Sequence, residues 1–437
     1  MTIYNLVSLF GIVVLLGIAF LFSNNRNKIN YRIIYWGIGI QIIFAVFIFL
    51  IPVGAKFFLY LNDIVVQIMN SSAAGAKFLF GRLALPPGTQ NEYGETSLGF
   101  YLAFQALPTI IFFSALVSIL YFYGIMQKPI KGFSYVFTKL MRISGAESLS
   151  AASNIFVGIE SAFTIRPFLN RMTKSELCTV LTAGMATVSS NILALYIFTL
   201  HNEFPTIAAH LISASILSAP AAIIMSKVLF PETETPETLG LKVNPHYKKE
   251  SSLFESIING SSSGVRLIVG IAAVLVAVIG LVALVDLFLG LMGTNINSLT
   301  NSDFKYSLAN IFGYIFYPLT LILGIPFSDV LEASKIIGER IIVTEVVSYQ
   351  DLSLAIKDGV ITNPRSITII TYALCGFAHL ASMAIFVGGI SAIATERRRE
   401  IASLGFRSLF AATLACLMTA CIAGVFFTGS SILLLQK

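Results

Sequence analysis

The chain contains repeated apolar stretches of the length needed to cross a lipid bilayer. A membrane helix needs about 20 predominantly apolar residues. Candidates lie at 4–23, 33–53, 99–124, 177–199, 206–230, 266–292, 366–394 and 404–434. Of 437 residues, 56% are hydrophobic and only 11% are charged, whereas soluble domains carry about 25% charged residues. We therefore expect an all-α polytopic membrane protein with eight transmembrane helices in the lipid bilayer.

Basic residues between the apolar stretches predict the orientation. The loop 24–32 is basic, and so is the segment 396–400. Because loops rich in Lys and Arg stay on the cytoplasmic side, both should face inward, which places the N-terminus outside. The first apolar run has no basic n-region and no cleavage site, so it reads as a membrane helix rather than a cleaved signal. The net charge of +6 then reflects topology, and we expect no nucleic-acid partner.

Two segments do not fit as crossings. Residues 143–170 begin and end on the predicted inner side, and residues 327–360 begin and end on the outer side. Such segments are re-entrant hairpins, whose polar backbone must line protein or water. Each is followed by a helix interrupted by polar residues and then by another crossing. Two such units of opposite orientation form an inverted repeat, and substrate normally binds at the repeat interface.

The predicted organisation has six parts. They are 1–98 with the first two crossings and an interfacial helix, 99–142 with the third crossing and a connecting helix, 143–230 with the first hairpin and crossings four and five, 231–265 as a cytoplasmic loop, 266–326 with the sixth crossing and a connecting segment, and 327–437 with the second hairpin and crossings seven and eight. The interfacial helix is expected within 54–90, where charged residues interrupt an apolar pattern.

Each predicted hairpin carries one carboxylate, Glu160 in the first and Glu345 in the second. A charged side chain in the hydrocarbon core costs roughly 3 kcal/mol on insertion scales, so it normally faces a partner or a water-filled path. Both segments are too rich in Ser, Thr, Asn and Gly to be ordinary spanning helices. This pattern is typical of a transporter.

Further polar residues cluster near these carboxylates. The first hairpin adds Asn154, Gly158 and Ser161, and the fourth crossing contains the polar run 187–191. Opposite one another, these segments can supply the amide, hydroxyl and carbonyl oxygens that a sodium ion prefers. The alternatives are a kinked helix with a satisfied carboxylate, and hydroxyls that only bond a neighbouring helix.

The seventh crossing has a predicted break at Gly376, followed by His379 and Ser382. The two polar residues are three apart and would share a helix face. The alternative is a structural histidine. The chain has no phosphate-binding loop, dinucleotide fingerprint or Cys/His metal cluster. We therefore expect no enzyme and no cofactor, but a carrier driven by an ion gradient; a passive channel or a membrane enzyme are the remaining alternatives.

Several ordered motifs carry a family resemblance. They are Asn-Ile-Phe-Val-Gly (154–158), Ile-Arg-Pro-Phe-Leu (165–169), Met-Thr-Lys-Ser-Glu-Leu (172–177), Ser-Ala-Pro-Ala-Ala (218–222), Pro-Glu-Thr-Glu (231–234), Tyr-Ala-Leu-Cys-Gly-Phe-Ala (372–378), Glu-Arg-Arg-Arg-Glu-Ile-Ala-Ser-Leu-Gly-Phe-Arg (396–407) and Met-Thr-Ala-Cys-Ile-Ala-Gly (418–424). Together they cover roughly residues 100–428 in order, and the chain resembles the concentrative nucleoside transporter family. The resemblance implies a homotrimer in the cytoplasmic (inner) membrane that carries nucleosides inward with sodium or protons, by an elevator-like movement of a transport part against a scaffold.

The resemblance also implies roles for individual residues. Glu345 matches a carboxylate that holds the ribose, Phe377 an aromatic residue near the base, and Ser382 a ribose-binding hydroxyl. The sodium site matches Asn154 together with the carbonyls of Val157 and Ile192.

Four positions depart from the family pattern. Gly158-Ile159-Glu160-Ser161 is one residue short and lacks a base-reading glutamine. His379 replaces a ribose-binding asparagine, Thr344 replaces an asparagine, and Asn191 replaces a sodium-ligand serine. We expect a sodium-coupled nucleoside importer with Glu160, Ser161, Glu345, Phe377, His379 and Ser382 at the substrate and Asn154, Val157, Asn191 and Ile192 at sodium. The alternative is a proton-coupled carrier of nucleosides, of a modified nucleoside or of another polar cyclic solute; a histidine that exchanges protons near neutral pH motivates it.

Overall fold

The computed structural model describes residues 2–91, 93–158, 160–246, 250–300 and 304–429. Over these ranges the chain is mainly helical, and the only pairing of extended backbone is two isolated bridges. The helices are α1 Ile3–Leu21, α2 Tyr31–Ala45, α3 Pro52–Phe80, α4 Leu102–Gln105, α5 Leu107–Phe122, α6 Gln127–Met141, α7 Gly145–Asn154, α8 Ser161–Thr164, α9 Lys174–Ala186, α10 Ser190–Leu200, α11 Ile207–Leu229, α12 Leu253–Thr300, α13 Leu308–Ile322, α14 Val330–Glu339, α15 Glu345–Lys357, α16 Pro364–Leu374, α17 Leu380–Ile393 and α18 Arg398–Phe426.

Seven helical segments of the described chain are long and apolar enough to cross a membrane. They are α1, α2 with its continuation to Leu50, α4–α5, α9–α10, α11, α12 and α18 with the turn before it. The shorter helices α13 and α17 are also apolar. The chain is therefore a mostly helical, multi-pass membrane protein, as its composition predicts.

Two predicted segments have clearly different bounds in the structure. Helix α12 begins at Leu253, inside the stretch 231–265 predicted as a cytoplasmic loop, because its first turns pack on α5. At Gly260 and Gly264 the backbones approach so closely that an added Cβ would lie 2.7 Å from Ser118 or Ile111, and small residues permit such contact. Helix α18 begins at Arg398 rather than at 404 and ends at Phe426; residues 430–434 of that prediction lie outside the described ranges.

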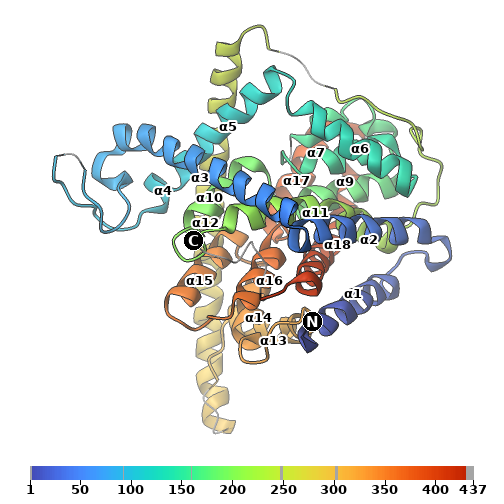
Figure 1. The fold of residues 1–437 in the computed structure, drawn as a ribbon. Coiled ribbons are helices and arrows are strands. Elements are labelled where there is room, and N and C mark those ends of the chain that lie inside the picture. Colours follow the sequence, from blue (N-terminus) through green and yellow to red (C-terminus); the bar gives the residue numbers. More distant parts are fainter. Residues whose placement is uncertain (1, 92, 159, 247–249, 301–303, 430–437) are drawn as a thin grey trace.

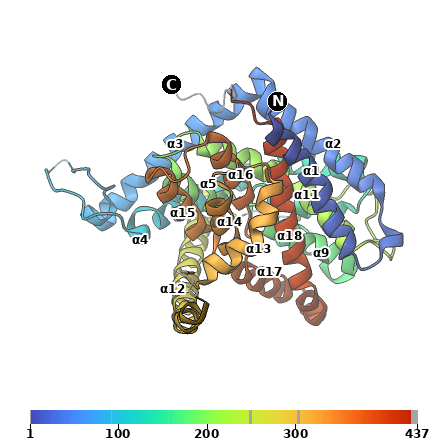
Figure 2. The same ribbon diagram turned by 90° about the horizontal axis from the view of Figure 1, so that it is seen from below.

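Helices α12 and α3 run in different directions. Helix α12 stands upright in Figure 1 and is seen nearly end-on in Figure 2. Helix α3 lies across the page in both views. Its direction is therefore steeply inclined to that of α12, the longest helix of the described chain at 48 residues.

The interior is built around α11 and α18, which pack on each other and on α9 and α16. Of the 18-residue apolar windows in α11 and in α18, 89% is buried. Helix α11 is rich in Ala and Ser, and α18 in Ala, with further Ser and Thr. Small side chains let helix backbones approach closely where no hydrophobic force drives association. This core supports the shorter helices that carry the polar residues.

The same order of elements occurs twice around this core. A pair of short helices is followed by a broken helix and then by a long helix, first as α7–α8, α9–α10 and α11, and again as α14–α15, α16–α17 and α18. We call residues 143–170 the first helix pair and residues 327–360 the second helix pair.

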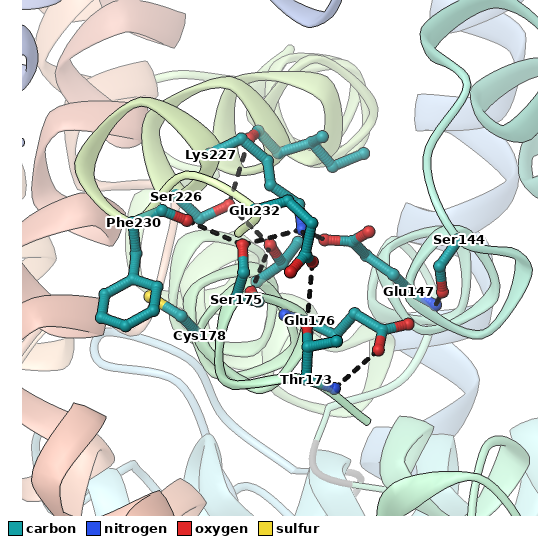
Figure 3. Close-up of polar contacts among 12 residues, drawn as sticks. Ser144, Glu147, Thr173, Ser175, Glu176, Cys178, Ser226, Lys227, Phe230 and Glu232 are labelled. Carbon is teal, nitrogen blue, oxygen red and sulfur yellow. Dashed lines mark hydrogen bonds and ion pairs between the residues drawn. The ribbon is translucent and has the colours of Figure 1, made fainter. Parts of the chain in front are cut away.

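Buried charges fasten the first helix pair to its neighbours (Figure 3). Lys227, in the last turn of α11, is 4% exposed, and its Nζ lies 2.7 Å from an oxygen of Glu147 in α7 and 3.3 Å from one of Glu232. The Nζ also donates to the Ser175 hydroxyl of α9 at 2.9 Å. Each partner belongs to a different segment, so one cation joins α7, α9, α11 and the chain that follows.

Candidate functional site

A cavity of ≈ 280 Å³ lies between the two repeated units and α12. The first repeat contributes Gly158, Glu160, Ser189 and Ile192 to its wall; the second contributes Thr344, Glu345, Val346, Phe377, His379, Ser382, Ile385 and Phe386; α12 contributes Arg266, Leu267, Gly270, Ile271, Val274 and Leu275. Five of the six predicted substrate residues therefore meet at one cavity. Pockets that are mostly apolar with a few convergent polar groups are typical of small-molecule sites.

The breaks in the two broken helices, α9–α10 and α16–α17, both lie beside this cavity. In α9–α10 the backbone is extended at Thr187 and Ser189. In α16–α17 the chain turns at Gly376, whose φ of +151° suits only glycine. A Cβ at Gly376 would also lie 2.8 Å from the carbonyl oxygen of Ala186, so the two breaks touch. The break predicted at Gly376 is confirmed.

Glu345 is held in a fixed position beside the cavity. It is the first residue of α15 and 3% exposed. The Tyr196 hydroxyl donates to its Oε1 at 2.5 Å, and the Nε2 of His379 lies 2.7 Å from its Oε2. A helix N-terminus also favours a negative charge. Because a carboxylate offers about four lone-pair sites, two donors leave capacity for hydroxyl groups of a substrate.

His379 caps the helix after the break. Its Nδ1 accepts a hydrogen bond from the backbone N–H of Ser382 at 3.2 Å, so Nδ1 must carry a lone pair and the ring proton lies on Nε2, facing Glu345. Ser382 Oγ in turn accepts from the backbone N–H of His379 at 3.3 Å. The sequence placed the two residues on one helix face; instead His379 precedes the helix as its N-cap, and the two residues meet through the cap.

The predicted residues of the first helix pair separate into two groups. Glu160 is exposed and faces the cavity. Ser161 is buried and turns away from the cavity, donating from its hydroxyl to Asn154 Oδ1 at 2.9 Å. Ile159, in the shortened stretch, lies outside the described residues.

The four predicted sodium residues come from two adjacent segments. The end of α7 and the break of α9–α10 are joined because Ser190 donates to the carbonyl of Phe156 from its N–H at 3.1 Å and its hydroxyl at 2.7 Å. Asn154 is the last residue of α7 and fully buried. Asn191 Oδ1 is buried without a hydrogen-bond partner among the described residues. Such an orphaned oxygen suits a hard cation.

Tyr196 and Arg266 were missed by the sequence analysis. Tyr196 is fully buried in α10, and a buried tyrosine hydroxyl usually needs a partner, which is the one signal that could have found it. Arg266 belongs to the first apolar turns of α12, where its position looks like an ordinary membrane-boundary residue.

Comparison with family models matches most of the chain. The Na+ dependent nucleoside transporter N-terminus matches residues 10–83, the nucleoside recognition model residues 103–203, and the Na+ dependent nucleoside transporter C-terminus residues 210–424.

Individual relatives agree with these models. The chain is 36% identical to mouse Solute carrier family 28 member 3. The match covers 96% of this chain and 59% of the mouse protein. It is 34% identical to Nucleoside permease NupC of Helicobacter pylori, covering 97% of this chain and 98% of the permease. The structure of CNTnw in an inward-facing substrate-bound state matches with a TM-score of 0.86 and 33% identity, over 97% of this chain and 98% of that one. The chain therefore belongs to the concentrative nucleoside transporter family, whose members are transporters and not enzymes.

Proposed function

We propose that the protein imports nucleosides across the cytoplasmic membrane, driven by a sodium gradient. The observation that carries the proposal is Glu345, a buried carboxylate fixed by Tyr196 and His379 at the wall of a cavity between the two repeats. A carboxylate that accepts two hydroxyls makes directional, charge-assisted contacts, which suit the vicinal diol of a ribose. Phe377 at the same wall can contact the base, and Ser382 the sugar.

The repeated order of elements supports an inverted repeat. In this proposal the two helix pairs are re-entrant hairpins, the eight crossings are those predicted, and the N-terminus faces outside. The inclination of α3 to α12 in Figures 1 and 2 supports α3 as the interfacial helix. The transport part, built on the two repeats, moves against a scaffold that contains α12, and three protomers form the assembly.

Sodium is favoured as the coupling ion by the chemistry of its predicted ligands. Asn191 replaces a serine in the family pattern, yet its unpartnered Oδ1 still offers an oxygen beside Ile192. Asn154, the last residue of the adjacent helix α7, and Val157, three residues beyond it, complete the set. The ion would supply positive charge beside the first helix pair, and these residues would hold it.

Proton coupling is the alternative, because His379 lies 2.7 Å from Glu345 and the pair could share a proton. The cap weighs against a coupling proton on the ring itself. A second ring proton would remove the Nδ1 lone pair that receives the Ser382 N–H, so the helix cap would be lost, and only the Glu345 carboxylate could take the proton with the cap intact.

Uptake into proteoliposomes tests both readings. Labelled uridine, adenosine and guanosine are offered with either a sodium or a proton gradient. We expect accumulation of at least one nucleoside with sodium alone. Accumulation with protons alone would support the alternative, and accumulation of none under either gradient would exclude nucleoside transport.

A further inference from the structure

Arg340 has the largest side chain among those that are fully buried in the described chain. It follows α14 directly, five residues before Glu345. No carboxylate of the described residues lies within 4.0 Å of its guanidinium, and its Nε and Nη2 have no hydrogen-bond partner there. Buried charges are normally paired, because an uncompensated one is strongly destabilising. Arg340 therefore needs another source of stabilisation.

The end of α16 provides that stabilisation. Nη1 of Arg340 donates to the carbonyl oxygen of Ala373, in the last turn before the break. Tyr349 donates from its hydroxyl to the carbonyl of Thr371 at 3.0 Å. The final carbonyls of a helix lack partners within the helix and form the negative end of its dipole. Two side chains of the second helix pair thus cap α16.

The same segment also holds the other side of the break. The backbone N–H of Leu380, the first residue of α17, donates to the carbonyl of Ile341 at 3.1 Å. Residues 340 and 341 therefore contact the chain just before and just after residues 375–379. Those five residues include Phe377 and His379 of the cavity wall.

We infer that Arg340 is a positioning residue of the substrate site, which caps α16 and so fixes the α16–α17 break against the second helix pair. The inference rests on the proposed nucleoside transport. Arg340 touches no substrate; it acts by keeping Phe377 and His379 aligned with Glu345. Any separation of the second helix pair from the break must open the contacts of Arg340 and Ile341 together.

Three substitutions distinguish the capping role of Arg340 from a role in which its side chain only fills space. Arg340→Lys keeps the charge at the helix end, Arg340→Gln keeps a neutral donor, and Arg340→Met keeps only the volume. We expect the KM for uridine in sodium-driven uptake to rise by roughly ten- to hundredfold in the Met variant, the worth of one hydrogen bond from a charged donor. The Lys variant should lie between wild type and Met, with kcat changed less than KM.

Natural thiols give a readout that is independent of transport. Cys375 and Cys416 are both fully buried, and Sγ of Cys416 lies 3.5 Å from the carbonyl oxygen of Cys375, two residues beyond the Ala373 carbonyl that Arg340 caps. In a background with Cys178 and Cys421 replaced by Ala, a small maleimide should label the two remaining thiols about tenfold faster in Arg340→Met, if one charged hydrogen bond is lost.

The outcomes decide the role of Arg340. A KM and a labelling rate within about twofold of wild type in folded Arg340→Met would overturn the inference, since the lost hydrogen bond predicts at least tenfold. If the Met variant does not fold, the inference requires Lys to label more slowly than Gln, and the reverse order would overturn it. Wild-type protein that takes up no nucleoside would refute the proposed function instead, while the labelling comparison would still test the cap.

Discussion

Each helix pair is held by a buried cation, but one cation is paired with carboxylates and the other with a backbone carbonyl. Lys227 binds the first pair through Glu147 and also meets Glu232. Arg340, within the second pair, donates to a backbone carbonyl and meets no carboxylate among the described residues. Separating the first contact would leave unpaired buried charges, which is costly. Separating the second would break a hydrogen bond to a neutral carbonyl and no ion pair of the described residues. We therefore expect the first helix pair to be the fixed one and the second to be the one that opens.

The largest expected effect concerns the fixed contact. Lys227→Met should lower the free energy of unfolding by about 3–5 kcal/mol, because it leaves Glu147 buried without its cation. The denaturation midpoint in detergent measures the change, with Lys227→Arg as the control that keeps the charge. A loss below about 1 kcal/mol, the value typical of exposed pairs, would remove the contrast between the two helix pairs.

Substitution of Glu345 should affect transport rather than stability. In Glu345→Gln we expect uptake to fall by about a hundredfold, since charge-assisted hydrogen bonds contribute about 1.5–3 kcal/mol each. Glu345→Asp keeps the charge but is too short to meet both Tyr196 and His379, so its uptake should be intermediate. Uptake by Gln equal to wild type would remove Glu345 from the site; elution of both variants at the same volume as wild type is the control for folding.

The sodium proposal predicts that substitution of Asn191, in the first repeat, has a smaller effect, and that this effect is confined to the sodium dependence of uptake. Asn191→Ala should raise the sodium concentration for half-maximal uptake by about tenfold, the effect of losing one oxygen ligand worth about 1.4 kcal/mol. Asn191→Ser restores the hydroxyl of the family pattern and should stay close to wild type. If sodium dependence is the same in all three proteins, Asn191 is not a ligand.

The smallest effect is expected at His379. Asparagine is a strong N-cap, so His379→Asn should keep α17 capped while losing the contact with Glu345. We expect the KM for uridine to change by less than about tenfold, because asparagine still offers a neutral hydrogen-bond donor at this position, with an altered preference among nucleosides. His379→Phe, which loses both contacts, is the matched comparison. An unchanged substrate profile in both variants would leave His379 a purely structural role.

The sequence predicts those parts of the site in which a single residue is unusual for its surroundings. Glu345 is conspicuous as a carboxylate in an apolar segment, and Gly376 as a glycine inside a predicted crossing. Those signals are local because charge and backbone freedom belong to single residues. They marked each segment by itself, whereas the family resemblance implied that Glu345, Phe377 and Ser382 share one site.

Other features depend on tertiary contacts and could not be predicted. Arg340 looks like a charged residue at the end of a short helix, and only its burial against Ala373 reveals a cap on another helix. Ser161 is adjacent to Glu160 in sequence but turns to Asn154, because the short helix α8 sends neighbouring side chains to opposite sides. The early start of α12 depends on contacts of its glycines with α5. The change from polar to apolar residues along the sequence does not reveal such contacts.

The contact between Gly376 and the carbonyl of Ala186 has a consequence for how the two halves of the chain can vary. Each break belongs to a different repeat, yet a side chain at Gly376 would meet the backbone of Ala186 in the other repeat. A substitution at Gly376 would have to be matched by a movement of residues 186–187, so mutations at these positions should be epistatic. The residues of each repeat that line the cavity can vary independently, but residues at the contact between the two breaks must change together.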